Sequence, residues 1–236
     1  MSAIASHPAP RRRGGRRPAG PRPDDPRVVR SRAAVLEAAR SLFLRQGYAG
    51  TTMEEIAAAA GLTKRTVYNN YADKEALFTR IVTEVTAYAE VFARGLRPEF
   101  AGITRATLRP TLEDLAHRMA LGIVRPEVIA LRRLLIGEAR EFPDLARGYF
   151  DRAPGQVLDA LASGFARLGR AGLLRVSNAR VAAAQFAYLV AGPPLDRAML
   201  VGTVPSRKDV IACAREGVQT FLARYEAPSG GRGRKA

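Results

Sequence analysis

The sequence predicts an all-α protein, built from a small N-terminal group of three helices and a larger helical C-terminal domain. Apolar residues recur three and four positions apart along most of the chain, which is the period of an amphipathic helix. Glycine and proline separate these stretches, and they favour the ends and the first turns of helices. No stretch suggests a strand, so we expect no β-sheet.

The expected helices are bounded by residues that start or stop a helix. The expected caps are Thr52, Thr63, Asp73, Thr111, Asn178 and Ser206. Gly47 ends the first helix, Gly95 or Pro98 ends the long fourth one, and Gly192 ends the last but one. The main ranges are 30–45, 64–70, 74–94, 111–123, 126–141, 145–150, 154–168 and 179–191, with a last helix after Ser206.

The chain of 236 residues is strongly basic, with a net charge of +16, and 47% of its residues are apolar. This charge favours a polyanionic partner, but it does not separate DNA from RNA or acidic lipid. Cys213 is the only cysteine, which fits a reducing compartment. No secretion signal is visible, and no apolar stretch is long enough to span a bilayer. We therefore expect a cytoplasmic protein that does not enter a membrane.

Much of the positive charge lies at the two ends of the chain. Residues 1–27 are rich in proline, arginine, glycine and alanine and show no periodic apolar face. We expect a disordered basic tail there, and a second disordered tail at residues 227–236. The first tail either follows DNA phosphates or the minor groove, or it is a solvated segment that adds only salt-sensitive affinity.

A segment in the first third of the chain predicts two short helices joined by a tight turn. Thr52 and Glu55 have the spacing of a capping box, in which each side chain accepts from the other residue's backbone amide. Gly61 can take the left-handed conformation that ends a helix, and Thr63 can cap the next one. The second helix is polar and basic on one side. These features indicate a helix-turn-helix DNA-binding domain, which we place at residues 28–80.

Several positions at fixed spacing resemble a known family: Phe43, Gly47, Tyr48, Thr51, Thr52, Ile56, Ala57, Ala60, Gly61, Val67, Tyr68 and the run from Lys74 to Phe78. Through them, residues 30–80 resemble the N-terminal domain of the tetracycline-repressor (TetR) family. Residues 134–140, 142–143, 172–174 and 182–186 are similar to its AefR-like C-terminal domain. The resemblance implies a homodimeric transcription regulator, in which the larger domain, here residues 81–226, dimerises and binds a small effector. The family often has Tyr or His on a phosphate where this chain has Asn70.

Candidate DNA contacts lie on the second helix of the motif and at the helix ends beside it. They are Thr51, Thr52, Thr63, Lys64, Arg65, Thr66, Tyr68, Asn69, Asn70 and Lys74. Arg65 is the candidate for a bidentate contact with guanine, and Asn69 for one with adenine. Lys64 and Lys74 are expected to contact phosphates. Thr51 and Thr52, at the start of the first helix of the motif, are expected to do the same. The alternative is a solvated helix face that contacts nothing.

One short recognition helix reads only a few base pairs, so we expect a two-fold dimer on an approximately palindromic operator. The candidate dimer surface lies on the helices at 155–169 and 179–191, which would pack against their copies as a four-helix bundle. Its residues are Ala160, Leu161, Gly164, Phe165, Ala183, Phe186, Ala187 and Val190. The alternative is that these side chains face the core of their own chain.

The resemblance also implies a pocket for a small apolar effector, whose binding would shift the dimer to a form that no longer fits DNA. Candidate lining residues are Met119, Ile123, Leu131, Leu135, Tyr149, Phe165, Phe186 and Tyr188, with His117 and Glu138 as polar anchors. Apolar residues at helical spacing are more often core than pocket, and a lone histidine is more often structural than a ligand. A regulator that responds to no ligand is therefore a second interpretation.

Two other classes of protein compete with a regulator. An enzyme is disfavoured because the chain has only two histidines, one cysteine, no cluster spaced for a metal and no phosphate-binding glycine loop, so we expect neither a cofactor nor catalysis. Ser163 lacks the flanking glycines of a nucleophile elbow. A nonspecific DNA-packaging protein driven by the basic tails would bind every duplex equally and release it with salt.

Overall fold

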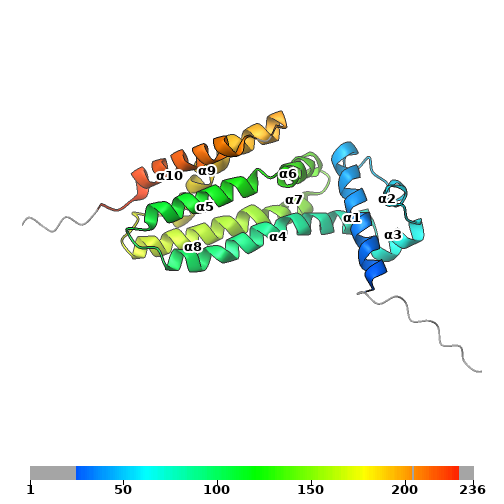
Figure 1. Cartoon of the computed structure of the whole chain (residues 1–236), viewed down its shortest axis with the longest axis horizontal. Helices are drawn as coiled ribbons and strands as arrows, with labels where there is room; N and C mark the ends of the chain where they lie inside the picture. The colour runs from blue at the N-terminus through cyan, green and yellow to red at the C-terminus, as the bar shows by residue number, and fades with distance from the viewer. Residues whose placement is uncertain (1–24, 204, 229–236) are drawn as a thin grey trace, which may run out of the picture.

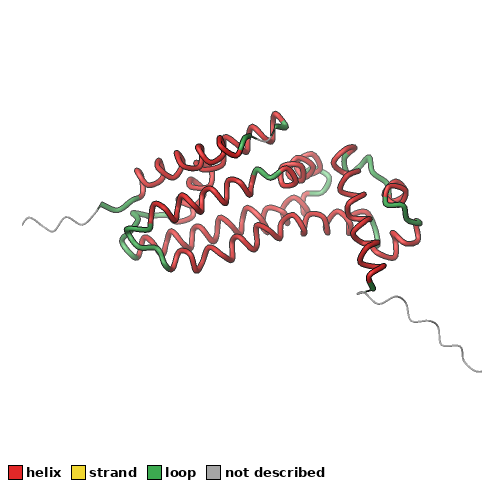
Figure 2. Tube along the Cα trace, viewed as in Figure 1, coloured by secondary structure: helices red, strands yellow, loops and turns green. Residues whose placement is uncertain are grey.

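The computed structural model describes residues 25–203 and 205–228. Figure 1 shows an elongated molecule, with the first three helices at one end and the C-terminal end of the last helix at the other. The described residues form helices and loops, as Figure 2 shows, with one isolated antiparallel bridge between Leu174 and Glu226. The predicted all-α fold is confirmed. Residues 1–24 and 229–236, which make up most of the two predicted tails, lie outside the described part.

The N-terminal helices are α1 (Pro26–Gln46), α2 (Met53–Ala59) and α3 (Lys64–Asn70). α1 begins before the expected Arg30, so the last residues assigned to the tail are helical. Asp25 caps it by accepting from the Arg27 amide at 2.8 Å, and Pro26 occupies the first turn. Proline is favoured there because the first amides of a helix have no partner within it. An Asp-Pro pair was thus the start signal that sequence reasoning overlooked.

α2 and α3 form the predicted helix-turn-helix. The Thr52 amide donates to the Glu55 carboxylate at 2.8 Å, and the Glu55 amide donates to the Thr52 hydroxyl at 3.2 Å. This is the complete capping box. Gly61 takes the left-handed conformation, with φ +65°, and Thr63 caps α3 by accepting from the Thr66 amide. All of these local predictions are confirmed.

A small apolar core holds α1, α2 and α3 together. Val35, Phe43 and Ile56 are buried in it, and Val67 is the only residue of α3 that is buried. Because α3 gives the core one side chain, most of its other side chains are left for solvent or a partner.

α4 (Lys74–Ala101) runs from the helix-turn-helix into the body of the molecule, where it lies beside α8 (Figure 1). Asp73 caps it as predicted. The expected end by Pro98 is wrong, because the helix continues through this proline. Leu96 and Phe100 are buried in the body core, and their packing holds the last turns helical. One helix therefore connects the two parts of the molecule.

The next helices are α5 (Leu108–Ile123) and α6 (Pro126–Glu138). α5 begins after Thr107 rather than at the expected cap Thr111, since Leu108 is already buried in the core. α6 begins at Pro126 as predicted but ends before the expected Glu141. The amides of Glu141 and Phe142 both turn back onto the carbonyl of Glu138, which closes the helix in a tight turn.

The chain then stays helical through α7 (Pro143–Phe150), a π-helix η1 (Asp151–Gly155) and α8 (Gln156–Arg170). The sequence predicts a new helix beginning at Pro154. Instead, the wider π turn contains Pro154, which has no amide to donate to the regular ladder. A π turn of this kind often lies at a functional site in a helix.

The last two helices are α9 (Ala179–Val201) and α10 (Arg207–Tyr225), capped by Asn178 and Ser206 as predicted. The expected end of α9 at Gly192 is wrong, because the helix continues through Pro193 and Pro194. Pro194 and Ala198 are buried, so tertiary packing outweighs the loss of two amide donors. α9 ends at Gly202, which has φ +79°.

Two apolar cores organise the molecule. The body core contains the packed rings of Phe165, Phe186 and Phe221, with centroids 4.8 to 5.3 Å apart. The Phe186 ring meets the other two edge-on. The second core lies under α1, α2 and α3 and includes Leu131 and Leu135 of α6. α6 therefore belongs to the body but packs against the N-terminal helices.

Candidate nucleic-acid interface and effector cavity

α3 lies at the end of the molecule away from the body (Figure 1), and polar residues make up its exposed face. Arg65 and Asn69 are exposed, and Tyr68 is 48% exposed. Arg65 makes no ion pair within the described residues. Thr66 is half-buried and its hydroxyl lies 2.9 Å from that of Thr63, the exposed cap. The face thus offers one free guanidinium, one phenol and one amide.

Lys64, at the start of α3, is exposed but already has an anionic partner. Its Nζ lies 2.9 Å from Oε1 of Glu54 on α2. This hydrogen bond lowers the pKa of the Glu54 carboxyl below its ordinary value. A DNA phosphate would have to replace Glu54, and because the pair is exposed the exchange costs little.

Thr52 is exposed at the start of α2, and its hydroxyl serves the capping box. Thr51, beside it, is completely buried, and its hydroxyl donates to the Gly47 carbonyl at 2.8 Å. The prediction that the Thr51 side chain contacts a phosphate is wrong, because that side chain is inside the fold. Sequence reasoning treated the two threonines alike, although only one belongs to the cap.

Lys74 is the second candidate that the structure assigns to the fold rather than to DNA. Its Nζ donates to the carbonyls of Tyr48 and Thr51, both at 2.9 Å, and lies 4.4 Å from the centroid of the Tyr48 ring. The half-buried ammonium thus holds the loop between α1 and α2 against α4. The predicted phosphate contact is wrong in this conformation, since the donors already have carbonyl partners.

Asn70 is half-buried at the end of α3 and points to α1. Its Nδ2 donates to the Ser31 hydroxyl at 3.1 Å. The Asn70 side chain therefore holds α3 on α1. It was a candidate for a DNA contact, but its amide points to Ser31 instead.

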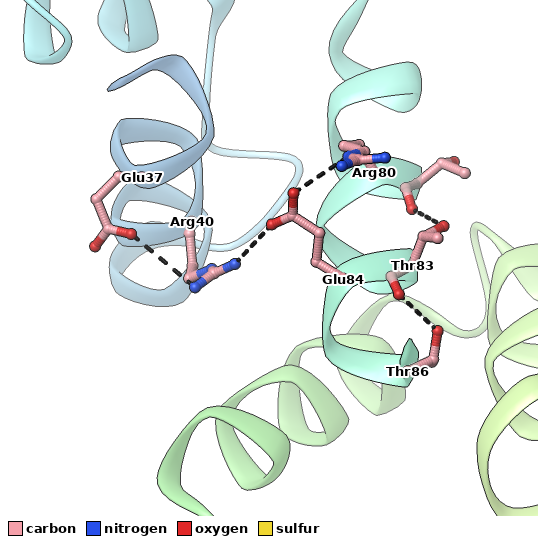
Figure 3. Close-up of polar contacts among 7 residues, drawn as sticks. Glu37, Arg40, Arg80, Thr83, Glu84 and Thr86 are labelled. Carbon is pink, nitrogen blue, oxygen red and sulfur yellow. Dashed lines mark hydrogen bonds and ion pairs between the residues drawn. The ribbon is translucent and has the colours of Figure 1, made fainter. Parts of the chain in front are cut away.

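A group of charged side chains joins α1 to α4 where the DNA-binding helices meet the body, as Figure 3 shows. Nη2 of Arg40 lies 3.3 Å from Glu84, whose other oxygen accepts from Nε of Arg80 at 3.2 Å. Nε of Arg40 is buried and has no hydrogen-bond partner in the described part of the chain. Sequence reasoning missed this link, because the spacing of Arg80 and Glu84 signals their own pair but nothing places Arg40 opposite them.

Glu138 makes a second link between the two parts of the molecule. It lies at the C-terminal end of α6, and its Oε1 accepts from the Tyr48 amide at 3.0 Å. The prediction that Glu138 anchors an effector is wrong, because α6 brings this carboxylate to the α1–α2 loop.

The body contains a cavity with a volume of about 190 Å³, lined by side chains from α4 to α9 and from η1. The predicted effector residues Met119, Ile123, Tyr149 and Tyr188 line it. Gly122 lets the Tyr88 ring pack against α5, since a Cβ there would lie 2.8 Å from Cε1 of the ring. The π turn contributes Ala153 and Pro154.

The remaining effector candidates lie outside this cavity. Phe165 and Phe186 are completely buried in the body core, and Leu131 and Leu135 belong to the core shared with the DNA-binding helices. These predictions are wrong because the inward positions of each helix fill a core. His117 is not among the lining residues either, and its Nε2 is buried without a hydrogen-bond partner among the described residues.

The predicted dimer surface is also largely internal. Six of its eight residues are buried in the chain's own core: Leu161, Gly164, Phe165, Ala183, Phe186 and Val190. The prediction is wrong for these six, because α8 packs on α4 and α9 packs on α10. A Cβ on Gly164 would lie 2.3 Å from the Phe100 ring, so no second copy can approach there. Ala160 and Ala187 are half-buried, and Ala187 lines the cavity.

A capped helix, a left-handed glycine and a second helix with an exposed polar face define a helix-turn-helix DNA-binding protein. The chain belongs to the TetR family of bacterial regulatory proteins. The model of its N-terminal domain matches residues 35–81. The model of the AefR-like transcriptional repressor C-terminal domain matches residues 110–227, half of the chain. The protein is therefore a DNA-binding transcriptional regulator, of a family whose members are generally not enzymes.

Two curated relatives share part of the sequence. The transcriptional regulator AlkX of Mycobacterium tuberculosis is 26% identical over 116 residues, which cover 42% of this chain and 52% of AlkX. The transcriptional regulator TcmR of Streptomyces glaucescens is 35% identical over 85 residues, 36% of each chain. The matches thus span about half of one relative and about a third of the other.

Two solved structures match nearly the whole described fold. A protein described as a TetR-family transcriptional regulator from Mesorhizobium loti MAFF303099 is 29% identical, with a TM-score of 0.73, and the match covers 86% of this chain and all of that one. The flavonoid-responsive regulator FrrA is 27% identical, with a TM-score of 0.64, covering 85% and 100%.

Within residues 25–203 and 205–228, none of the helices has the length and apolar character needed to cross a membrane. In the same residues, no three or more His, Cys, Asp or Glu side chains gather where they could hold a metal ion.

Proposed function

We propose that this regulator is a cytoplasmic homodimer that represses transcription from an approximately palindromic operator and is released by a small, largely apolar effector. The observation that carries the proposal is the exposed polar face of α3, with Arg65, Tyr68 and Asn69 free of the core. One short helix covers only a few base pairs, so a two-fold pair of them supplies the affinity and specificity that an operator needs.

In the proposed complex, the N-terminal end of α3 enters the major groove. Arg65 has the reach and the free guanidinium to bind guanine O6 and N7 through two parallel hydrogen bonds. Lys64 exchanges Glu54 for a phosphate, and the exposed Asn69 lies one turn further along the same helix. The half-sites are then separated by about one turn of duplex, roughly 34–36 Å, or by a multiple of it.

Exposed apolar side chains on α9 support the proposed dimer. Tyr188 is 70% exposed, Leu200 84% and Val201 67%, and Val181 is also exposed. Apolar surface of this kind commonly marks a site of protein association. Replacing Leu200 and Val201 with glutamate should give monomers in sedimentation experiments, and a variant that stays dimeric would place the interface elsewhere.

The cavity supports the proposed response to an effector. Val85, Tyr88 and Phe92 of α4 line it, and the same helix begins at Lys74, directly after the DNA-reading α3. A ligand that fits one tilt of α4 better than another shifts the dimer toward that tilt by its difference in affinity. The Arg40–Glu84 and Glu138–Tyr48 contacts connect that helix and α6 to the DNA-binding helices. FrrA, described as flavonoid-responsive, is a structural relative of this fold.

The test is a selection from random duplexes with the full-length protein, followed by titration of the selected duplex with and without apolar compounds. We expect a palindromic motif, tight binding that persists at moderate salt, and weaker binding in the presence of an effector. Equal affinity for all duplexes that disappears with salt would support the DNA-packaging alternative. A palindrome whose affinity changes with none of the compounds would support a ligand-independent regulator.

A further inference from the structure

Arg132, on α6, is the one charged residue that lines the cavity. The rest of the wall consists of apolar side chains, glycines and three tyrosines. Arg132 is half-buried, and it forms part of the cavity wall. A cation beside an apolar wall favours a ligand that carries an anion or several acceptors to compensate its charge.

Within the described residues, Arg132 has neither an ion pair nor a side-chain hydrogen bond. The two glutamates of its own helix are occupied elsewhere. Glu127 pairs with Arg125, and Glu138 accepts from the Tyr48 amide. The fold thus places a cation at an apolar cavity and supplies it with no acid.

Tyr149 provides a second polar group in the same cavity. Its side chain is buried, and burial raises the pKa of the phenol, while the positive charge of Arg132 opposes this shift. The phenol therefore stays protonated at neutral pH and can donate. Its hydroxyl makes no hydrogen bond to the other described residues, so the donor remains free for a ligand.

We propose that the effector is a small aromatic carboxylate, whose ring lies against the aromatic wall and whose carboxylate binds Arg132, with Tyr149 donating a further hydrogen bond. This inference rests on the proposed effector role of the cavity. The rings of Tyr88, Phe92 and Phe150 form the aromatic wall. A planar guanidinium matches a carboxylate through two parallel hydrogen bonds. A neutral ligand leaves the guanidinium without an anion, and a cationic ligand is repelled.

The experiment compares matched pairs of ligands on the full-length protein by calorimetry, in the absence of DNA. The probes are benzoate, 2-naphthoate and 2-anthracenecarboxylate, each against its primary amide and its aminomethyl cation. The variants are Arg132→Met, which keeps the apolar stem without the charge, and Arg132→Lys, which restores the charge without the planar fork. Arg133→Met is the matched control, because Arg133 is exposed and does not line the cavity.

We expect at least one carboxylate to bind about tenfold or more tightly than its amide, since a charged hydrogen bond is worth that much when partly buried. Arg132→Met should reduce this preference to about twofold while amide binding changes little, and Arg132→Lys should recover part of it. Arg133→Met should behave as the wild type. Equal binding of carboxylate and amide, a preference for the cation, or a preference that survives Arg132→Met would overturn the proposal.

Failure of the ligand proposal and failure of the proposed function give different results. Calorimetry without DNA measures ligand binding, whereas the duplex selection without ligand measures DNA recognition. A protein that selects a palindrome but binds none of the carboxylates refutes the ligand class and keeps the DNA-binding role. If the protein binds 2-naphthoate through Arg132 but binds all duplexes equally, the ligand class is supported and the proposed operator is refuted.

Discussion

Lys64, the first residue of α3, and Lys74, the first residue of α4, differ in burial and in their partners. Lys64 is exposed, and its partner is the exposed carboxylate of Glu54. Lys74 is half-buried and donates to two backbone carbonyls that would otherwise lack this donor. A phosphate can replace the partner of the first lysine easily, but taking the second would open the α1–α2 loop.

We expect Lys74→Met to reduce the free energy of unfolding by about 1–2 kcal/mol, because two hydrogen bonds from a charged donor are lost at a partly exposed site. The salt dependence of DNA binding should stay the same. Lys64→Met is the control, and it should leave stability nearly unchanged while lowering the salt slope by about 0.9 for each protomer bound. Urea denaturation and binding at several salt concentrations measure both quantities. A lower salt slope in Lys74→Met would instead show that Lys74 contacts a DNA phosphate in the complex.

Some residues of the α3 site could be predicted from the sequence, and others could not. The exposed face of α3 was predictable, since caps and a left-handed glycine define that helix and Val67 alone is needed for its packing. Thr51 and Lys74 were misjudged because nothing local shows which polar side chain turns inward. Arg132 was missed for the same reason, since its place in the cavity depends on how α6 packs against other helices.

At the scale of elements, one glycine lets the side chain of one helix pack directly on the backbone of another. Gly164 of α8 lies under the Phe100 ring of α4, so that a Cβ would be 2.3 Å from its nearest atom. Gly95 of α4 has nothing within 4 Å of the same position. The two glycines lie within helices, so they differ only in what an added methyl group would meet.

We therefore expect Gly164→Ala to destabilise the fold by about 1–3 kcal/mol, because the ring and the methyl group cannot share the space. Gly95→Ala should instead stabilise it by up to about 1 kcal/mol through higher helix propensity. Thermal unfolding of both variants checks the pair. Equal and favourable effects would show that α4 and α8 are further apart than described.

The capping box predicts a dependence of stability on pH. Hydrogen bonds from the amide and hydroxyl of Thr52 lower the pKa of Glu55 below its ordinary value of 4.5. A depressed pKa in the folded state means that the carboxylate contributes stability above about 4.5 and loses that contribution as the pH falls through the folded pKa. In Glu55→Gln, which keeps an acceptor but cannot titrate, stability should fall less between about pH 5 and pH 3. Identical unfolding profiles of the two proteins would contradict this role.

The number and order of the helices could be predicted from periodicity and caps, but several of their ends could not. Local signals end α4 before Pro98 and α9 at Gly192, yet both helices continue. In each case, buried side chains beyond the break, such as Phe100 and Ala198, keep the chain helical. That stabilisation comes from distant helices, and a local pattern does not contain it.

At the scale of the whole molecule, the DNA-binding helices and the body share a core and two polar links. Leu131 and Leu135 of α6 pack in the same cluster as Phe43 and Phe78. The Arg40–Glu84 pair connects α1 to α4 beside this cluster (Figure 3). In the proposed response to an effector, these contacts carry a change at the cavity to α3.

We expect Arg40→Met to weaken this coupling. The aromatic carboxylate that binds most tightly should still bind the variant normally, but the ratio of operator affinities with and without it should fall by about two- to tenfold, as expected for loss of one partly buried ion pair. Arg80→Met is the matched control, since Arg80 pairs with the same Glu84 inside α4. Equal ratios in the wild type and Arg40→Met would contradict a role for this link in the response.

Sequence reading by α3 is tested most directly by the base preferences of the wild type and Arg65→Ala at every position of the selected operator. We expect the variant to lose about 1–3 kcal/mol of discrimination at one guanine in each half-site, at symmetric positions, while affinity for unrelated duplexes falls only slightly. A uniform loss of affinity at all positions, or an unchanged profile, would contradict the claim that the exposed face of α3 reads the DNA sequence.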